Sequence, residues 1–412
     1  MGPAIQCRLI AVGLSWIGAC TSGEVSSARQ RDVPSASFLS VSATDSGGVE
    51  LIDVLSVPSL DDLAIAWSLE LVRSIEAGGV GPGEAPSWYE AQAITRFDDG
   101  TLVLVDRGDP RVVVIAGESD KVLARFGRSG KGPGEIHGSY VALWPGQDGT
   151  FWVADSGNGR VSRFSLDGEL LGEASWVATG ERTAAWRVTP DRGELVAEIL
   201  ENGGASARTV WHHSLARLDP AGGLFNRILQ LPSEDLAKSS PARIWSPRSI
   251  WAALPSGLVV VGRSDVATYR IHARDGTLLR EIRLPLTRKA IDAAEMQEVM
   301  EEIGAVAELS AAASQVDPSV AQYYPIHNDM WPLNDSVFAT LQTRRGRAAD
   351  DPDLPREERY WRTISTSGRR IGSIRFPQGF IPRWVGDGRI VGVQEDTLGA
   401  IRIQEYLLRA PQ

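Results

Sequence analysis

Histidine, carboxylate and amide side chains are the groups in this chain whose types suit metal binding or acid–base catalysis. The sequence has five histidines: His137, His212, His213, His272 and His327. Zinc and calcium sites use His, Asp, Glu and Asn ligands, so His137 and His327 could form a site with a carboxylate such as Asp155 if the fold brings them together. His212 and His213 are adjacent, and on a strand they would point to opposite sides. The alternative is that the histidines are separate surface or loop residues.

Other chemistries lack their sequence signatures. The chain contains no nucleophile elbow, no HExxH motif, no phosphate-binding loop and no dinucleotide fingerprint. Its only cysteines are Cys7 and Cys20, so the chain beyond them holds neither a disulfide framework nor a thiolate metal site. The formal net charge of −10 argues against nucleic acid as a partner, because phosphate binding needs a concentrated basic surface. We therefore expect no cofactor, unless the histidines bind a divalent metal such as calcium or zinc.

The elements that would position these side chains form a repeat. We expect short antiparallel strands at 141–144, 150–155 and 160–166 and a fourth from 169, separated by the turn sequences GQDG, SGNG and LDGE. The preceding segment repeats the pattern, because Asp106 and Arg111 match Asp155 and Arg160 at an offset of 49 residues. The sequence GPGE at 81–84 also recurs at 132–135. Such a period indicates four-stranded sheets that stack against one another.

Two stretches carry a family resemblance. VADSGNGRVSRFSLDGELL (153–171) resembles the NHL-repeat consensus, and with FGRSGKGPGE before it the chain resembles the bacterial six-bladed β-propeller lipoproteins. The turn between first and second strands recurs six times, at Asp99-Gly100, Asp148-Gly149, Asp191-Arg192-Gly193, Pro255-Ser256-Gly257, Asn334-Asp335-Ser336 and Gly386-Asp387-Gly388. We therefore expect an all-β fold, a six-bladed β-propeller of four-stranded antiparallel blades.

Two further features refine this fold. The segment LELVRSIE (69–76) lies where each later blade has its outermost strand, and the final IRIQEYLLRA has no such strand after it. We expect the N-terminal strand to close the last blade, because closure removes two exposed sheet edges. One helical insertion is expected at about 288–322, where Met296, Val299, Met300 and Ile303 recur at helical spacing.

The N-terminal residues resemble an export signal. Arg8, the apolar run LIAVGLSWI and Ile17-Gly18-Ala19-Cys20 resemble a lipoprotein signal peptide that ends in a lipobox, which implies a lipid on Cys20. The alternative is a plain signal peptide or a chance apolar start. Residues 21–48 are rich in Ser, Ala and Gly and are expected to form a flexible tether, and 49–412 the propeller. This organisation predicts an exported cell-envelope lipoprotein, periplasmic or at the outer membrane, that contacts the membrane only through its anchor.

Strand direction in a propeller places the turn between strands two and three and the loop into the next blade on one rim. The polar residues expected there are Arg107, Asp109, His137, Asp155, Asn158, Arg160, Arg263, Asp265, His327, Asn328 and Asp329. Asp155 and Arg160 could belong to a ring of ligand-binding residues. Alternatively they cap turns and pair with each other or with the next blade, and their repetition at Asp106 and Arg111 favours this structural role. The GPGE loop could likewise hold an anion or only form a tight turn.

These observations support two hypotheses of different classes. The first is a monomeric binding or scaffolding module without catalysis, whose rim contacts an envelope protein, a peptide or a glycan. The second is a metal-dependent hydrolase or lyase, similar to lactonases, with His137, His327 and Asp155 at the mouth of the central tunnel.

Overall fold

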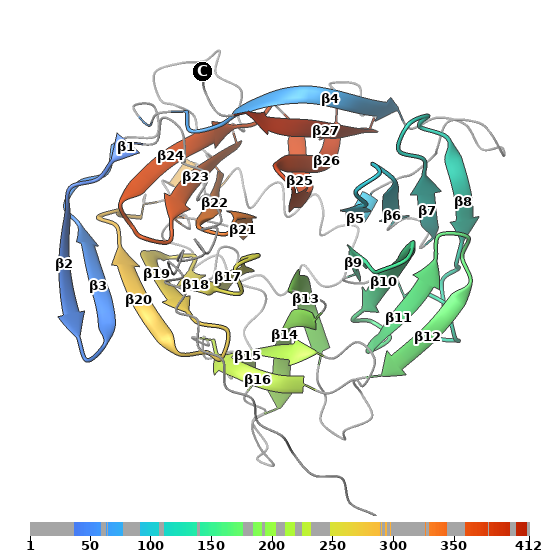
Figure 1. The fold of residues 1–412 in the computed structure, drawn as a ribbon, viewed down its shortest axis with the longest axis horizontal. Helices are drawn as coiled ribbons and strands as arrows, with labels where there is room; N and C mark the ends of the chain where they lie inside the picture. The colour runs from blue at the N-terminus through green and yellow to red at the C-terminus, as the bar shows by residue number, and fades with distance from the viewer. Residues whose placement is uncertain are drawn as a thin grey trace, which may run out of the picture. The chain divides into compact units, whose positions relative to one another are not determined.

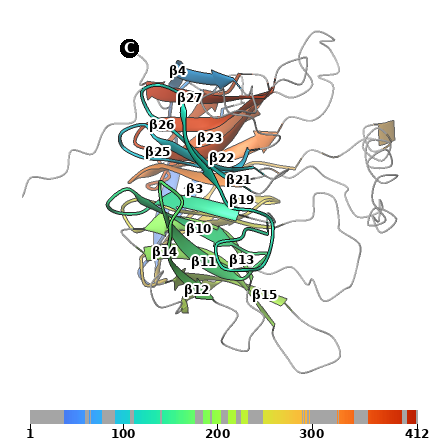
Figure 2. The same cartoon turned by 90° about the vertical axis from the view of Figure 1, so that its right-hand side faces the viewer.

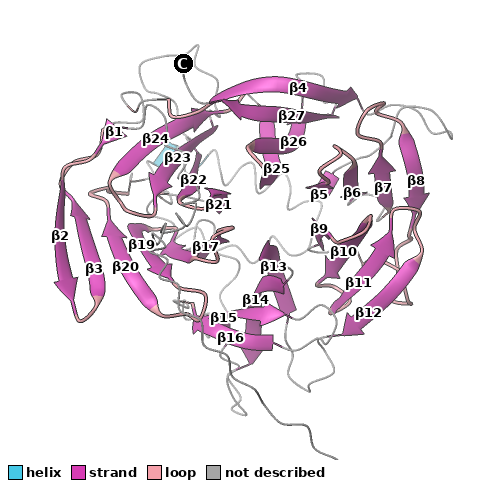
Figure 3. Cartoon of the chain, in the orientation of Figure 1, coloured by secondary structure: helices cyan, strands magenta, loops and turns pink. Residues whose placement is uncertain are grey.

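Alternating apolar residues and tight turns fold the chain into six sheets around a common axis (Figure 1). The computed structural model describes residues 37–58, 63, 65–76, 91–106, 111–137, 141–175, 184–191, 194–202, 211–218, 225–231, 248–288, 290, 293–294, 297, 326, 329–343, 359–377, 379–395 and 401–409. They lie in a compact unit that spans Pro34–Gln412. Nearly all the elements drawn are strands (Figure 3). The expected six-bladed β-propeller is confirmed.

Blades 1 to 3 follow one another along the chain, each as an antiparallel meander. Blade 1 consists of β5 (Ala91–Arg96), β6 (Leu102–Asp106), β7 (Val112–Ile115) and β8 (Val122–Phe126). Blade 2 consists of β9 (Val141–Pro145), β10 (Thr150–Asp155), β11 (Arg160–Ser165) and β12 (Leu170–Ser175). Blade 3 consists of β13 (Ala184–Asp191), β14 (Glu194–Asn202), β15 (Trp211–Leu218) and β16 (Phe225–Gln230).

Blades 4 to 6 take additional strands from the N-terminal part of the chain. Blade 4 contains β17 (Ser249–Ala253), β18 (Val259–Arg263), β19 (Val266–His272) and β20 (Leu278–Arg283). Blade 5 contains β21 (Asp329–Asn334), β22 (Val337–Thr343), β23 (Arg359–Ser365) and β24 (Arg370–Arg375). Blade 6 contains β25 (Phe380–Gly386), β26 (Arg389–Glu395) and β27 (Ile401–Arg409).

The N-terminal strand β4 (Ser68–Glu76) closes the ring as expected. It pairs antiparallel with β27 and becomes the fourth strand of blade 6 (Figures 1 and 2). Two arginines clamp this blade to blade 1. Arg73 of β4 forms an ion pair with Asp120 at 2.5 Å, and Arg96 of β5 forms one with Glu405 of β27 at 2.9 Å. Pairing removes the open edge that β27 would otherwise present.

The residues before β4 extend two blades. β2 (Val41–Ser46) and β3 (Val49–Val54) form a hairpin, and β3 pairs in parallel with β20, which makes blade 4 a six-stranded sheet. β1 (Ser37–Phe38) pairs with β24 of blade 5. Ile52 is fully buried against blade 4, which explains why the hairpin docks. A flexible tether reaching residue 48 was therefore wrong for the part from residue 37 onward.

The core lies between neighbouring blades. In the fully buried β6, Leu102 and Leu104 pack toward blade 6, whereas Val103 and Val105 pack toward blade 2. This follows from the alternation of side chains along a strand, so a strand buried on both faces reads as a continuous apolar run. One consequence is that each blade completes the core of the next.

Turn residues occur where the sequence predicts them. Asp387 and Gly388 both have positive φ, 49° and 69°, in the two-residue hairpin between β25 and β26.

Of the insertion expected at 288–322, the structure describes residues 288, 290, 293–294 and 297, and the last three are helical. The leader and Cys20 are not among the described residues. Within the described part, no helix has the length and apolarity to cross a bilayer.

Candidate functional site

Of the eleven rim residues predicted from the sequence and Cys20, seven are described by the structure. They are His137, Asp155, Asn158, Arg160, Arg263, Asp265 and Asp329. The others lie outside the described residues, and they are Cys20, Arg107, Asp109, His327 and Asn328. The described residues separate into a group on blade 2, a group on blade 4 and Asp329 at the start of β21, whose carboxylate accepts the backbone N–H of Met330 at 2.8 Å.

Asp155 ends β10 and is buried, with 2 % of its surface exposed. Its Oδ2 accepts the backbone N–H of His137 at 2.7 Å and the side-chain amide of Asn158 at 2.8 Å. Its Oδ1 accepts the backbone N–H of Gly157 at 3.1 Å. Both oxygens are therefore occupied by the turn that follows β10 and by the loop that precedes β9. This geometry is that of a structural cap rather than of a metal ligand or general base.

Asn158 and Arg160 fasten the same loop. The Asn158 amide donates to the carbonyl of Gly130 at 2.9 Å. Arg160 Nη2 donates to the carbonyl of Glu135 at 2.6 Å, and Nη1 contacts the carboxylate of Glu173 at 3.2 Å. These contacts confirm that the turn after β10 and the GPGE loop share one rim. They also assign Arg160 to holding that loop, not to an open surface.

In the GPGE loop, the loop's own Glu135 carboxylate occupies the position that an external anion would take. The Glu135 carboxylate accepts the backbone N–H of Gly132 at 2.7 Å and the Arg128 Nε–H at 2.6 Å. The Gly132 hydrogen bond and the Arg128 contact together lower the pKa of Glu135, so it stays ionised in this position. A Cβ added at Gly130 would lie 1.9 Å from the same carboxylate, which shows how closely the loop wraps it. An external anion would have to displace Glu135.

His137 is the exposed member of the blade 2 group. Its ring lies over Gly157, where an added Cβ would come within 2.5 Å of Nδ1. Within the described residues, no group of three or more His, Cys, Asp or Glu side chains has the geometry to hold a metal ion. The tunnel-mouth site expected from His137, His327 and Asp155 thus has one described member on the surface and one engaged in a turn.

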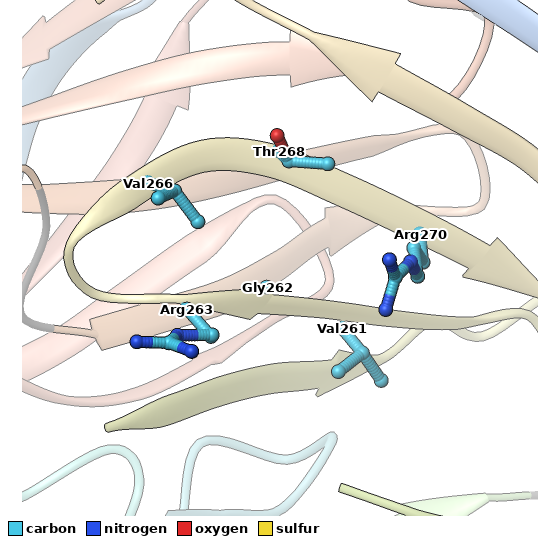
Figure 4. A pocket seen from close by; sticks show the side chains of 6 residues that line it. All are labelled: Val261, Gly262, Arg263, Val266, Thr268 and Arg270. Carbon is cyan, nitrogen blue, oxygen red and sulfur yellow. The ribbon is translucent and has the colours of Figure 1, made fainter. Parts of the chain in front are cut away.

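A pocket of about 200 Å³ lies on blade 4 near the turn between β18 and β19. It is lined by Val261, Gly262, Arg263, Val266, Thr268 and Arg270 (Figure 4). Arg263, predicted for this rim, is oriented by Asp265 through two hydrogen bonds, Nε to Oδ1 at 3.0 Å and Nη2 to Oδ2 at 2.9 Å. The walls combine valine side chains with two guanidinium groups, a composition typical of sites for ligands that are partly apolar and partly anionic.

Arg270 is the second guanidinium of this pocket. Its Nε donates to Glu281 at 2.8 Å, and Arg283 donates to the other oxygen of that carboxylate at 2.7 Å. Burial raises the pKa of Glu281, but the hydrogen bonds from Arg270 and Arg283 outweigh burial and keep the pKa below its ordinary value. Glu281 is therefore ionised at neutral pH and fixes the direction of Arg270. No described residue accepts a hydrogen bond from the terminal nitrogens of Arg270.

Sequence reasoning missed a polar group next to this pocket. Glu198 of blade 3 accepts the Trp251 Nε1–H of blade 4 at 2.8 Å, and its other oxygen lies 2.8 Å from Nδ1 of His213. Trp251 pairs with Val261 across β17 and β18, and Val261 pairs with Arg270 across β18 and β19. Trp251 and Glu198 therefore lie next to the pocket wall. It joins residues that are 53 positions apart in sequence, and only the stacking of blades brings them together.

Comparisons with known proteins identify a fold and no family. No family model matches the chain, and no curated protein matches it. A solved DUF4221 family member from Bacteroides vulgatus has a TM-score of 0.52 at 12 % identity and covers 83 % of this chain and 98 % of its own. Virginiamycin B lyase from Staphylococcus aureus is more distant, with a TM-score of 0.41 at 12 % identity. The match covers 83 % of this chain and 100 % of the lyase chain. The calcium-binding protein regucalcin from Agrobacterium tumefaciens is also more distant, with a TM-score of 0.40 at 10 % identity. The match covers 79 % of this chain and 92 % of the regucalcin chain. The chain is thus a β-propeller protein whose function must be argued from its own site.

Proposed function

We propose that this protein is an exported, lipid-anchored β-propeller of the NHL-repeat-like lipoprotein type that binds a peptide or protein segment at the rim of blade 4. The observation that carries the proposal is the pocket between β18 and β19. Its valines offer an apolar contact, and the terminal nitrogens of Arg270 offer donors that a carboxylate can accept. A segment with an acidic residue next to an aliphatic one supplies both. The ligand belongs to the cell envelope, in keeping with the proposed anchor on Cys20.

The structure of the rim supports binding over catalysis. Asp155 and Arg160, the titratable groups that recur between blades, are engaged in holding the GPGE loop. The carboxylates near the pocket, Asp265 and Glu281, are each paired with an arginine. Such groups orient donors and do not act as bases, since each is already the acceptor of a charged hydrogen bond. The proposed module works as a monomer, without a cofactor or nucleic acid.

Arg270→Met tests this proposal. We expect it to weaken binding to acidic, aliphatic peptides on a peptide array at least about tenfold, because one charge-assisted contact is lost. Arg283→Met is the matched control, since Arg283 shares Glu281 but does not line the pocket, and it should change binding by less than about twofold. A glycan array run in parallel covers the other ligand class. Equal binding by wild type and Arg270→Met would remove blade 4 as the site.

The metal-dependent alternative has its own measurement. Metal analysis of the purified protein, with a panel of lactones and esters, would reveal bound zinc or calcium and turnover. Turnover that is lost in His137→Ala would replace the binding module by an enzyme. We expect neither metal nor turnover, because His137 is exposed and Asp155 is saturated with hydrogen-bond donors.

A further inference from the structure

Arg362 of β23 is a buried cation for which the described residues provide no counter-charge. Only 3 % of its surface is exposed, and its Nε and Nη1 are buried with no hydrogen-bond partner. No described carboxylate lies within ion-pair distance of it. Arg160 and Glu405, which are buried to a similar extent, each have an ion-pair partner. Arg362 therefore differs from these two buried charges, for which an ion-pair partner is present.

The side chains around Arg362 are polar but uncharged. Thr340 of β22 and Ser373 of β24 lie beside it in one register row, on the face of blade 5 that packs against blade 4. Tyr269 of blade 4 is fully buried near the guanidinium, and burial raises its pKa to about 12 although Arg362 and Thr340 oppose the shift. The phenol is consequently neutral at physiological pH. It can donate a hydrogen bond, and it cannot neutralise the arginine.

An arginine cannot escape this situation by losing its proton. Burial lowers the pKa of Arg362, but a guanidinium starts from a value above about 12 and stays charged wherever the protein is folded. Enclosing an unpaired charge is strongly unfavourable, and proteins almost always pair such groups. A water molecule would satisfy the unused N–H groups but would leave the charge.

We propose that a small monoanion, a halide or a short carboxylate, binds between blades 4 and 5 beside Arg362. The Nε and Nη1 groups of Arg362 donate to it, and the hydroxyl groups of Tyr269 and Thr340 border it. One guanidinium balances one negative charge, so a dianion would leave a net buried charge and is excluded. The site joins two blades through an ion and is separate from the pocket between β18 and β19, which lies on the opposite face of blade 4.

Thermal unfolding tests the site directly. Wild-type protein is melted in a zwitterionic buffer with gluconate as reference anion, and then with chloride, formate or sulfate at equal ionic strength. A ligand that binds only the folded state raises Tm with concentration, so we expect chloride or formate to add a few degrees at saturation. Sulfate stabilises proteins generally, so it should change the Tm of wild type and of Arg362→Met by the same amount. Arg362→Met should melt in gluconate at or above the wild-type temperature and should not respond to chloride or formate, because both the charge and its counter-ion are gone.

Three controls separate this outcome from general salt effects. Arg362→Lys keeps the charge and should keep a weaker response. Arg160→Met removes a paired buried arginine, so it should lower Tm yet retain the wild-type response. Crystals soaked in bromide should show an anomalous peak beside Arg362. The proposal is overturned if wild type and Arg362→Met respond alike to every anion, or if no monoanion stabilises the wild type and Arg362→Met is the less stable protein.

Discussion

The polar side chains around the turn after β10 hold the chain's own loops. Asp155, Asn158 and Arg160 bind backbone groups of the segment that precedes β9, and Glu135 caps that segment from within. The sequence allowed both a structural and a ligand-binding reading of Asp155 and Arg160. Their hydrogen bonds favour the structural one, because a carboxylate with both oxygens occupied has little left to offer a ligand.

Tyr269 gives a residue-level prediction of pH dependence. Its pKa is about 12 in the folded protein and about 10 in an unfolded chain, so between these values the folded state keeps a proton that the unfolded state has lost. The contribution of Tyr269 to the free energy of unfolding is fully present below pH 10. It falls by up to about 1.4 kcal/mol per pH unit as the pH rises toward 12. Tyr269→Phe should flatten the slope of unfolding free energy across this window, measured by urea denaturation.

Tyr406 provides the comparison for this titration. Partial burial also raises its pKa, but less, and its hydroxyl donates to Gln404 at 2.6 Å. Tyr406→Phe should therefore change the alkaline slope less than Tyr269→Phe does. Equal slopes for wild type and Tyr269→Phe would show that Tyr269 ionises at an ordinary pH and is not enclosed.

At the scale of elements, the seam between β4 and β27 decides whether the ring is closed. Ile75 of β4 is 3 % exposed and packs in the core between blades 6 and 1, whereas Leu71 of the same strand is 51 % exposed. Ile75→Asp should cost about 3 kcal/mol or more, because it places an unpaired charge in that core. Leu71→Asp should stay within about 0.5 kcal/mol. Chemical denaturation measures both, and similar losses would mean that β4 does not pack as described.

The strands differ in how readily the sequence reveals them. Blades 1 and 2 repeat their turn residues at a constant offset, and β4 matches a missing outermost strand, so these elements were predictable. The hairpin of β2 and β3 was not predictable, because half of β2 is Ser or Thr and all of it but Val41 is exposed. Gly47-Gly48 before the apolar-rich Val49–Val54 was the usable signal, since two glycines between possible strands favour a hairpin.

The candidate pocket was only partly predictable. Arg263 and Asp265 follow β18 in a turn whose rim could be deduced from strand direction. Arg270 and Glu198 come from strand interiors, and so does Arg362 of the separate site between blades 4 and 5. The sequence of a strand does not reveal which residue of the next blade lies opposite each position. Contacts such as Trp251 with Glu198 depend on how blades stack, which leaves no local trace in the sequence.

At the scale of the whole molecule, the proposed anchor determines where the propeller works. In the native host we expect mass spectrometry to find a mature N-terminus that starts at a diacylglycerol-modified Cys20, with the protein in the membrane fraction. Cys20→Ser should abolish the modification and leave the protein out of that fraction, while the purified propeller melts at an unchanged temperature. An unmodified Cys20 in wild-type protein would contradict the lipoprotein assignment.

The N-terminal strands are synthesised before the strands with which they pair in the finished ring. Glu70 pairs with Arg409, 339 residues later, and Glu50 with Arg280, 230 residues later. Synthesis starts at the N-terminus, so β1 to β4 are made before the strands of blades 4, 5 and 6 with which they pair. This delay has a consequence: the ring closes only after blade 6 has formed, because the strand that closes it, β4, pairs with β27 of that blade.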